Sequence, residues 1–291
     1  MERKSHIDTF GAISLFSFAI ILSFNQVVIK VTNGGFGPIF AAGLRSLIGL
    51  TCIVLWITLR RKPLRLSRDL VQSGLLVGGF FTFEFICLFL ALDLTTVARA
   101  SVIFYSMPVW LALVGHFVLP GERLTPTRLV GLCLAMAGVA VALADRNGGQ
   151  ASLLGDLLAL GAALGWGGIV LTVRLTPLAQ ERPETQLFWQ LLVSAVMLLA
   201  VAPLFGPLLR EVEPLHVAGL LFQGIGVVAI AFLIWFWLMS IYPASGVASF
   251  SFLSPVFSVL LGWLLLGERV GPSIWIALGL VALGLVFINR R

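Results

Sequence analysis

Four polar residues interrupt long apolar stretches in the first third of the chain: Asn25, Gln26, Arg45 and Glu84. Charged groups inside a membrane are costly, and they normally face a partner or a cavity. A guanidinium binds carboxylates, and a buried carboxylate takes up a proton or an ammonium group. These residue types therefore predict recognition of a small molecule that carries both charges. An inert Arg45–Glu84 ion pair that locks two helices fits the pattern equally well.

The four residues also share a depth. Each lies six to eight positions from the end of its stretch that is expected on the outer side of the membrane, which at 1.5 Å per residue is a depth of roughly 9 to 12 Å. In the second half, Gln190 is the equivalent of Arg45, so the two halves differ in charge at this position. Gln223 is a further polar candidate.

Aromatic residues offer the apolar wall that such a ligand needs. Phe81, Phe85 and Phe89 recur at i, i+4 spacing beside Glu84, so they share one helix stripe. Trp166 lies between two glycines that leave room against its ring. Tyr105, Trp235 and Trp237 are further candidates. For any single ring, lipid contact or ordinary packing is the simpler explanation.

The sequence lacks the patterns of other chemistries. No His pair, Asp pair or serine with a nearby base occurs at catalytic spacing within the apolar stretches, so an intramembrane enzyme is disfavoured. Three scattered cysteines and three isolated histidines predict neither a disulfide framework nor a metal site. Phosphate-binding and dinucleotide fingerprints are absent, so no cofactor is expected and energy would come from a gradient. Asp93 and Asp156, near the ends of stretches, read as solvated caps.

Membrane helices must position these residues. The chain is 59% apolar and 11% charged, with a mean hydropathy of +1.05, which is too apolar for a soluble globule. Unpaired backbone groups cannot face lipid, so each long apolar run predicts a helix and the fold class is all-α. We expect ten spans, at residues 10–32, 38–59, 69–92, 95–119, 126–144, 152–175, 186–205, 214–240, 244–266 and 272–289.

The net charge of +6 reflects topology and not a nucleic-acid partner. Five basic residues, Arg60 to Arg68, lie between the second and third spans. With a cytoplasmic N-terminus, 13 of the 19 Lys and Arg residues fall in inner segments and five in outer ones. This bias predicts cytoplasmic N- and C-termini. The first apolar run is long and lacks a small-residue cleavage site, so we expect a retained span.

The chain also contains an internal repeat. Ser106–Gly115 and Gly121–Pro126 recur as Leu253–Gly262 and Gly267–Pro272, and both copies carry a Gly-Glu-Arg turn. Five spans per half force the second copy to enter the membrane from the opposite face. We therefore predict two inverted five-helix repeats, residues 1–147 and 148–291, and a monomer suffices for function because one chain holds both.

Pro108 and Pro255 occupy equivalent positions in the fourth and ninth spans. Proline removes a helical hydrogen bond, so each span is expected to kink there. The kinks are either static or a pair of hinges that alternate access.

These features resemble the drug/metabolite transporter superfamily, specifically its duplicated EamA-type branch of ten-helix exporters. Within that branch the chain is most similar to bacterial exporters of aromatic and other amino acids. The resemblance implies export across the inner membrane through a central cavity, lined by the first four spans of each half. An arginine early in the second span is similar to the family pattern, whereas Glu84 matches no motif of the family.

The leading hypothesis is a secondary carrier in the bilayer that exports small amphipathic metabolites such as amino acids. Polar groups near one end of an aromatic cavity suit an amino-acid head and an apolar tail. The alternative is an exporter of aromatic cations or drugs, recognised by Glu84 and the rings. A lipid flippase is a further alternative, because it would share the inverted repeat.

Overall fold

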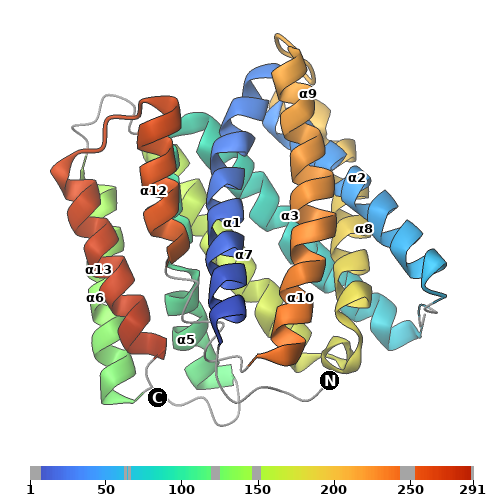
Figure 1. Ribbon diagram of the computed structural model, residues 1–291, viewed down its shortest axis with the longest axis horizontal. Helices are drawn as coiled ribbons and strands as arrows, with labels where there is room; N and C mark the ends of the chain where they lie inside the picture. Colours follow the sequence, from blue (N-terminus) through green and yellow to red (C-terminus); the bar gives the residue numbers. More distant parts are fainter. Residues whose placement is uncertain are drawn as a thin grey trace.

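The computed structural model describes residues 8–61, 64, 67–118, 125–145, 152–242 and 253–289, and these form an all-α bundle (Figure 1). Within these described residues, eight apolar segments are long enough to cross a membrane, and α12 and α13 are shorter apolar helices. Together they account for the ten predicted spans. The first copy of the Gly-Glu-Arg turn and the division between Asn147 and Gly148 lie outside the described residues.

The first half comprises α1 to α6, in which α4 and α5 form the fourth span. Their bounds are α1 Thr9–Gly35, α2 Pro38–Leu59, α3 Arg68–Leu94, α4 Val97–Phe104, α5 Met107–Val118 and α6 Pro126–Ala144. Side chains of Asp8, Ser67, Thr96 and Thr125 accept hydrogen bonds from backbone N–H groups in the first turns of α1, α3, α4 and α6. These caps fix where the helices begin.

In the second half, a π-helical segment, η3, interrupts the eighth span. The bounds are α7 Leu153–Leu175, η1 Pro177–Gln180, α8 Pro183–Val201, η2 Ala202–Phe205, α9 Pro214–Leu221, η3 Phe222–Ala231, α10 Phe232–Ile241, α12 Leu253–Leu266 and α13 Pro272–Asn289. The hydropathy pattern gave no signal for η3, because its ten residues are as apolar as their neighbours.

Two pairs of equivalent helices, α2 with α8 and α6 with α13, pack against each other and run antiparallel. Along α2 and α8, Gly43 lies against Leu199 and Gly49 near Leu191, and between these contacts the Ser194 hydroxyl donates to Ser46 Oγ at 3.0 Å. As one helix advances in number, its partner recedes. This order is the arrangement that the inverted repeat predicts.

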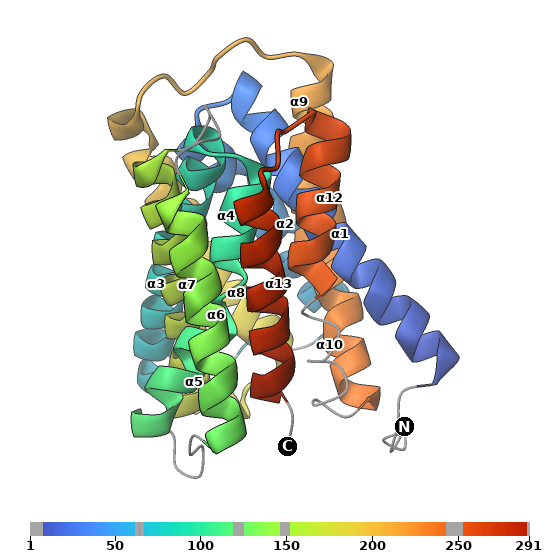
Figure 2. The ribbon, with the colours of Figure 1, turned by 90° about the vertical axis from the view of Figure 1, so that its left-hand side faces the viewer.

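The pair α6 and α13 shows the same symmetry on the outside of the bundle (Figure 2). Gly131 packs against Gly284, and Gly138 packs against Ala277. The repeat relates Gly131 to Ala277 and Gly138 to Gly284, so each contact is the two-fold partner of the other. A Cβ on Gly131 would lie 2.7 Å from the Gly284 carbonyl oxygen, which explains why glycine occupies this close approach.

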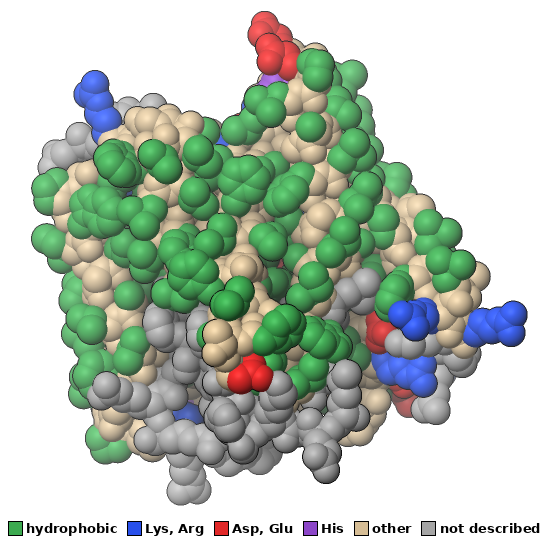
Figure 3. Space-filling view, viewed as in Figure 1, with side chains coloured by type: hydrophobic (Ala, Val, Ile, Leu, Met, Phe, Trp, Pro, Cys, Tyr) green, Lys and Arg blue, Asp and Glu red, His purple; other side chains and the backbone are tan. Residues whose placement is uncertain are grey.

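The surface matches a bilayer. Large apolar side chains are exposed around the helices, among them Ile13, Phe16, Leu55 and Leu75, and Figure 3 shows them covering the middle of one face with charged side chains toward its edges. α1 begins and α13 ends on the same side of the molecule, at the bottom of Figures 1 and 2. We call this side the terminal face and the other the opposite face.

Candidate functional site

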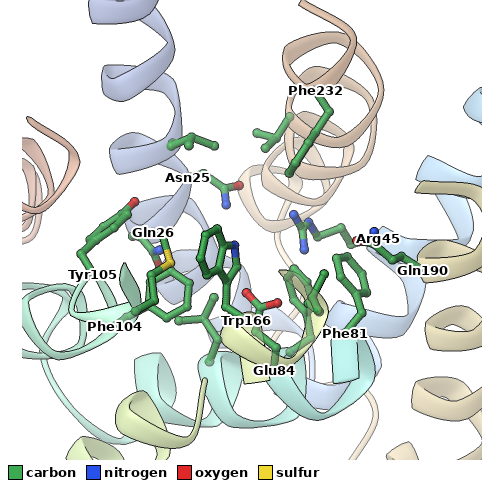
Figure 4. Close-up of a pocket in the computed structure, with 16 residues that line it drawn as sticks. Asn25, Gln26, Arg45, Phe81, Glu84, Phe104, Tyr105, Trp166, Gln190 and Phe232 are labelled. Atoms are coloured by element: carbon green, nitrogen blue, oxygen red, sulfur yellow. The ribbon is translucent and has the colours of Figure 1, made fainter. Parts of the chain in front are cut away.

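A cavity of about 150 Å³ lies between the two halves in the middle of the bundle (Figure 4). Its walls come from α1, α2, α3, the α4–α5 junction, α7, α8, η3 and α10. Helices α6 and α13, the fifth and tenth spans, pack on each other and supply none of its lining. The structure brings nine of the predicted residues together here: Asn25, Gln26, Arg45, Phe81, Glu84, Phe85, Tyr105, Trp166 and Gln190.

Two consecutive amides of α1 reach the cavity. The side chains of Asn25 and Gln26 are 6% and 4% exposed. The oxygens Asn25 Oδ1 and Gln26 Oε1 are buried and accept no hydrogen bond from the described residues. The Tyr105 hydroxyl lies beside Gln26. Because buried polar atoms are rarely left unpaired, these two acceptors mark a place for an outside donor.

Arg45 and Glu84 both point into the cavity but do not form the direct ion pair that the sequence suggested (Figure 4). The Arg45 guanidinium lies over the Phe85 ring, with its carbon 4.3 Å from the ring centroid. Its Nε donates to no described residue. Equal depth along two helices does not fix their rotation, and here the packing of α2 against α3 puts a ring beneath the cation. Both side chains therefore remain available to a ligand.

Aromatic rings form the apolar part of the wall. Phe81 and Phe85 contact each other with centroids 4.4 Å apart and ring planes tilted by 49°, and Trp166, Phe104 and Phe232 complete the set. A Cβ on Gly167, the neighbour of Trp166, would meet nothing within 4 Å. Phe89 continues the stripe of α3 but is fully buried among other helices and lies outside the cavity.

Of the two remaining predicted residues, Gln223 does not line the cavity. Gln223, on η3, is fully buried, and its Nε2 donates to Thr32 Oγ1 at 2.9 Å, so it links the eighth span to α1. The side chain of Trp235 lies outside the described residues. Sequence position alone could not separate Gln223 from the cavity amides, because all are polar residues inside a span.

Pro108 and Pro255 lie near the beginnings of helices. The helix of the fourth span breaks at Tyr105 and Ser106, and Pro108 is the second residue of α5. Tyr105 and Met107, at this break, line the cavity. Pro255 is the third residue of α12, and the residues before Leu253 lie outside the described part of the chain. Whether either proline acts as a hinge stays a prediction.

The interpretation of Asp156 and Asp93 as solvated caps was wrong. Asp156 is fully buried and accepts two hydrogen bonds from Arg99, from Nη2 at 2.6 Å and from Nε at 3.2 Å. Asp93 accepts from both terminal nitrogens of Arg210, at 2.8 and 2.9 Å, and this hydrogen bonding raises the pKa of the Arg210 guanidinium. Neighbouring elements cover these helix ends, fully at Asp156 and partly at Asp93, so each carboxylate has a cationic partner.

Sequence reasoning missed seven lining residues that carry no polar signal: Leu22, Leu88, Phe104, Met107, Ile169, Val227 and Phe232. Spacing held a partial clue. Leu22 precedes Asn25 by three residues and Leu88 follows Glu84 by four, so each lies on the same helix face as a polar candidate. Ile169 follows Trp166 by three residues and Val227 follows Gln223 by four, so these two had the same clue; only the packing reveals Phe104, Met107 and Phe232.

Comparisons with known proteins agree with this architecture. The EamA-like transporter family matches the chain twice, at residues 9–144 and 153–290. A probable amino-acid metabolite efflux pump of Escherichia coli is 28% identical over 99% of this chain and 95% of its own length. The aromatic amino acid exporter YddG of Ancylobacter novellus is 34% identical over 64% of each chain. An uncharacterized transporter of Bacillus subtilis, YoaV, is 26% identical over 95% of both.

A solved structure described as a crystal structure of protein superimposes with a TM-score of 0.67 at 25% identity, covering 95% of this chain and 97% of the other. The two family matches together span nearly the whole chain and coincide with the two antiparallel halves described above. The chain therefore belongs to the EamA-like transporter family, and it is a multi-pass membrane transporter built from two copies of the EamA unit.

Proposed function

We propose that this transporter is a secondary carrier that exports amino acids, aromatic ones included, and related small metabolites across the bacterial inner membrane. The observation that supports this most is the set of unpaired polar atoms in the cavity. Asn25, Gln26, Arg45 and Glu84 are all at least nine-tenths buried, yet Asn25 Oδ1, Gln26 Oε1 and Arg45 Nε have no partner among the described residues. Such atoms are costly unless a ligand satisfies them.

The donor and acceptor types match a zwitterion. An α-ammonium group has three N–H donors, and the cavity offers the Glu84 carboxylate together with Asn25 Oδ1 and Gln26 Oε1. An α-carboxylate needs donors, and Arg45 supplies Nε with a full positive charge. Rings from α3, α7 and α10 surround these groups and suit an apolar or aromatic side chain.

The inverted repeat supports transport by alternating access. Two units of similar structure and opposite direction exchange shapes when the cavity changes sides. We take the division near residue 147 as the boundary between the two moving units, and one chain holds both, so a monomer suffices. The excess of Lys and Arg in the segments of the terminal face favours placing that face in the cytoplasm.

Relatives give the amino-acid assignment independent support. The names of the Escherichia coli and Ancylobacter novellus proteins describe export of amino-acid metabolites and of aromatic amino acids. This chain shares no more than about a third of its residues with either, so its substrate range needs its own measurement.

The test is uptake into proteoliposomes with compounds that isolate each charge. Labelled tryptophan is the substrate, and the competitors are tryptamine, which lacks the carboxylate, and indole-3-propionate, which lacks the ammonium group. We expect unlabelled tryptophan to compete at least about tenfold better than either, because each analogue forfeits one charge-assisted contact. Absence of uptake for tryptophan, phenylalanine, threonine and glutamate, in folded protein, would refute the amino-acid proposal.

A second candidate, export of aromatic cations, is favoured by one observation: Glu84 faces the cavity without an ion pair to Arg45. The variant Arg45→Met separates the two proposals. It removes the carboxylate anchor and keeps the apolar stem, so zwitterion transport should fall while transport of tryptamine is retained or improved. Strong tryptamine transport by the wild type, unaffected by tryptophan, would favour the cation exporter.

A further inference from the structure

Two charged side chains from elsewhere in the chain bind the backbone at the turn between α3 and α4, on the opposite face. Lys30 of α1 donates through Nζ to the carbonyl oxygens of Leu92 at 2.9 Å and Thr95 at 2.6 Å, at the C-terminus of α3. Glu268, from the α12–α13 connection, accepts from the backbone N–H groups of Val97 at 2.6 Å and Ala98 at 3.0 Å, at the N-terminus of α4.

Both contacts match the local backbone charge. The C-terminus of a helix carries partial negative charge and the N-terminus partial positive charge, so a cation and an anion stabilise these two ends. Glu268 is only 4% exposed and interacts electrostatically with Lys30. The turn that presents it needs Gly267, whose φ is +63°, in the left-handed region that glycine adopts most readily.

Glu268 completes the N-terminal hydrogen bonds of α4. The N–H of Arg99 donates to Thr96 Oγ1 and that of Ala100 to the Thr96 carbonyl, which leaves Val97 and Ala98 for Glu268. A helix begins with four N–H groups that lack partners inside the helix. Of these, Thr96 Oγ1 in the first half accepts from Arg99, and Glu268 in the second half accepts from Val97 and Ala98; the Ala100 bond is the first one inside the helix.

Helix α4 joins this contact to the cavity. It has eight residues; its first two bind Glu268, and its last residue, Phe104, lines the cavity with Tyr105 at the break before α5. A displacement at one end of so short a helix moves the other end. Because the α12–α13 connection and α4 belong to different halves, a movement that separates the two on the opposite face would break the Glu268 contact.

We propose that Glu268 is a positioning residue for transport: its carboxylate latches α4 to the second half, and release of this latch opens the cavity toward the opposite face. The second copy of the Gly-Glu-Arg turn, residues 267–269, does not line the cavity, and this proposal gives it a role in gating. This role of Glu268 in gating does not depend on which substrate the cavity accepts.

The test measures access to the cavity from each side of the membrane. Leu22, which lines the cavity from α1, is replaced by cysteine in a background without Cys52, Cys87 and Cys133. A membrane-impermeant maleimide is then applied to right-side-out and to inverted vesicles. In Glu268→Gln we expect labelling from the opposite face to rise about tenfold or more, because the amide forfeits one charge-assisted acceptor of the latch.

A second variant breaks the same contact from the other partner. Val97 is the first residue of α4, where proline fits, so Val97→Pro removes the N–H that donates to Glu268 while keeping the helix. We expect about a threefold rise in labelling, since the Ala98 bond remains. Val97→Ala keeps the N–H and controls for the lost side chain, and Glu211→Gln controls for removing an exposed acid on the same face.

Maleimide labelling needs no substrate, so its result does not depend on the proposed function. A rise from the opposite face in Glu268→Gln and Val97→Pro, but in neither control, supports the latch. Unchanged labelling in both variants, in protein that is monodisperse in detergent, overturns it. A rise in Glu268→Gln alone would mean that the charge acts elsewhere than on α4, and equal rises on both sides would mean general loosening; each result also refutes the latch.

Discussion

The buried pair of Arg99 and Asp156 ties α4 of the first half to α7 of the second, and its removal should be costly. The side chains are 4% and 0% exposed. Arg99 makes two hydrogen bonds to Asp156 and a third, through Nη2 at 2.6 Å, to the Ala142 carbonyl oxygen. Thr95 Oγ1 donates to Asp156 Oδ1 at 3.2 Å. The pair is thus well hydrogen-bonded as well as oppositely charged.

The variant Arg99→Met removes the cation and leaves the Asp156 carboxylate in place at a fully buried position. Breaking a buried ion pair by removing one partner costs about 3–5 kcal/mol, and we expect this loss in the free energy of unfolding. Asp156→Leu should cost less, because Arg99 keeps its bond to the Ala142 carbonyl oxygen and a second carboxylate, Asp145 Oδ2, 3.8 Å from its Nη1. The double variant replaces both charges by apolar groups, so its cost should lie well below the sum of the two singles and close to zero.

The assay is unfolding in dodecylmaltoside micelles by titration with sodium dodecyl sulfate, followed by tryptophan fluorescence. Arg210 and Asp93 provide the matched control: their pair is also hydrogen-bonded but is 34% and 21% exposed, so Arg210→Met should cost only about 0.2–1 kcal/mol. Additive effects of the two single variants, or a loss below about 1 kcal/mol for Arg99→Met, would refute the reasoning that burial makes this pair strongly coupled.

Three further predictions concern the cavity and the packing of the two halves. Gly131→Val should lower the free energy of unfolding by about 1–3 kcal/mol, because its Cβ meets the Gly284 carbonyl, whereas Gly279→Val meets open space and should change it little in the same titration. Pro108→Ala should slow tryptophan transport more than it weakens tryptophan binding; equal losses in flux and in equilibrium binding would argue against a hinge. Glu84→Gln should raise the KM for tryptophan about tenfold and remove any acceleration by a proton gradient, and wild-type kinetics would exclude Glu84 as the ammonium site.

The depth of the polar residues could be read from the sequence, but their pairing could not. Residue counting placed Arg45 and Glu84 at one level, and the structure has both in the same cavity. The count carries no information on rotation about each helix axis, which decides that the Arg45 guanidinium lies on the Phe85 ring. Contacts between side chains of α2 and α3 set that rotation.

The same limit explains the errors at helix ends. Asp156 lies in the first turn of α7, where a sequence reading favours a solvated cap. In the structure α3, α4 and α7 pack together there, so water is excluded and Arg99 becomes its partner. The hydropathy pattern did not predict the π-helical segment Phe222–Ala231. The winding of the backbone there depends on packing against neighbouring helices, which the local sequence does not specify.

The sequence by itself determined the ten spans, the duplication and the opposed direction of the two halves. The length of each apolar run, compared with the thickness of the bilayer, identifies a span. An odd number of spans in each half gives the two halves opposite directions. Neither inference depends on how the helices pack. Tertiary structure alone decided which faces of those helices meet at the cavity, which charges pair and which remain free. Those outcomes depend on the rotation and close approach of helices distant in sequence, and side-chain packing at their contacts fixes both.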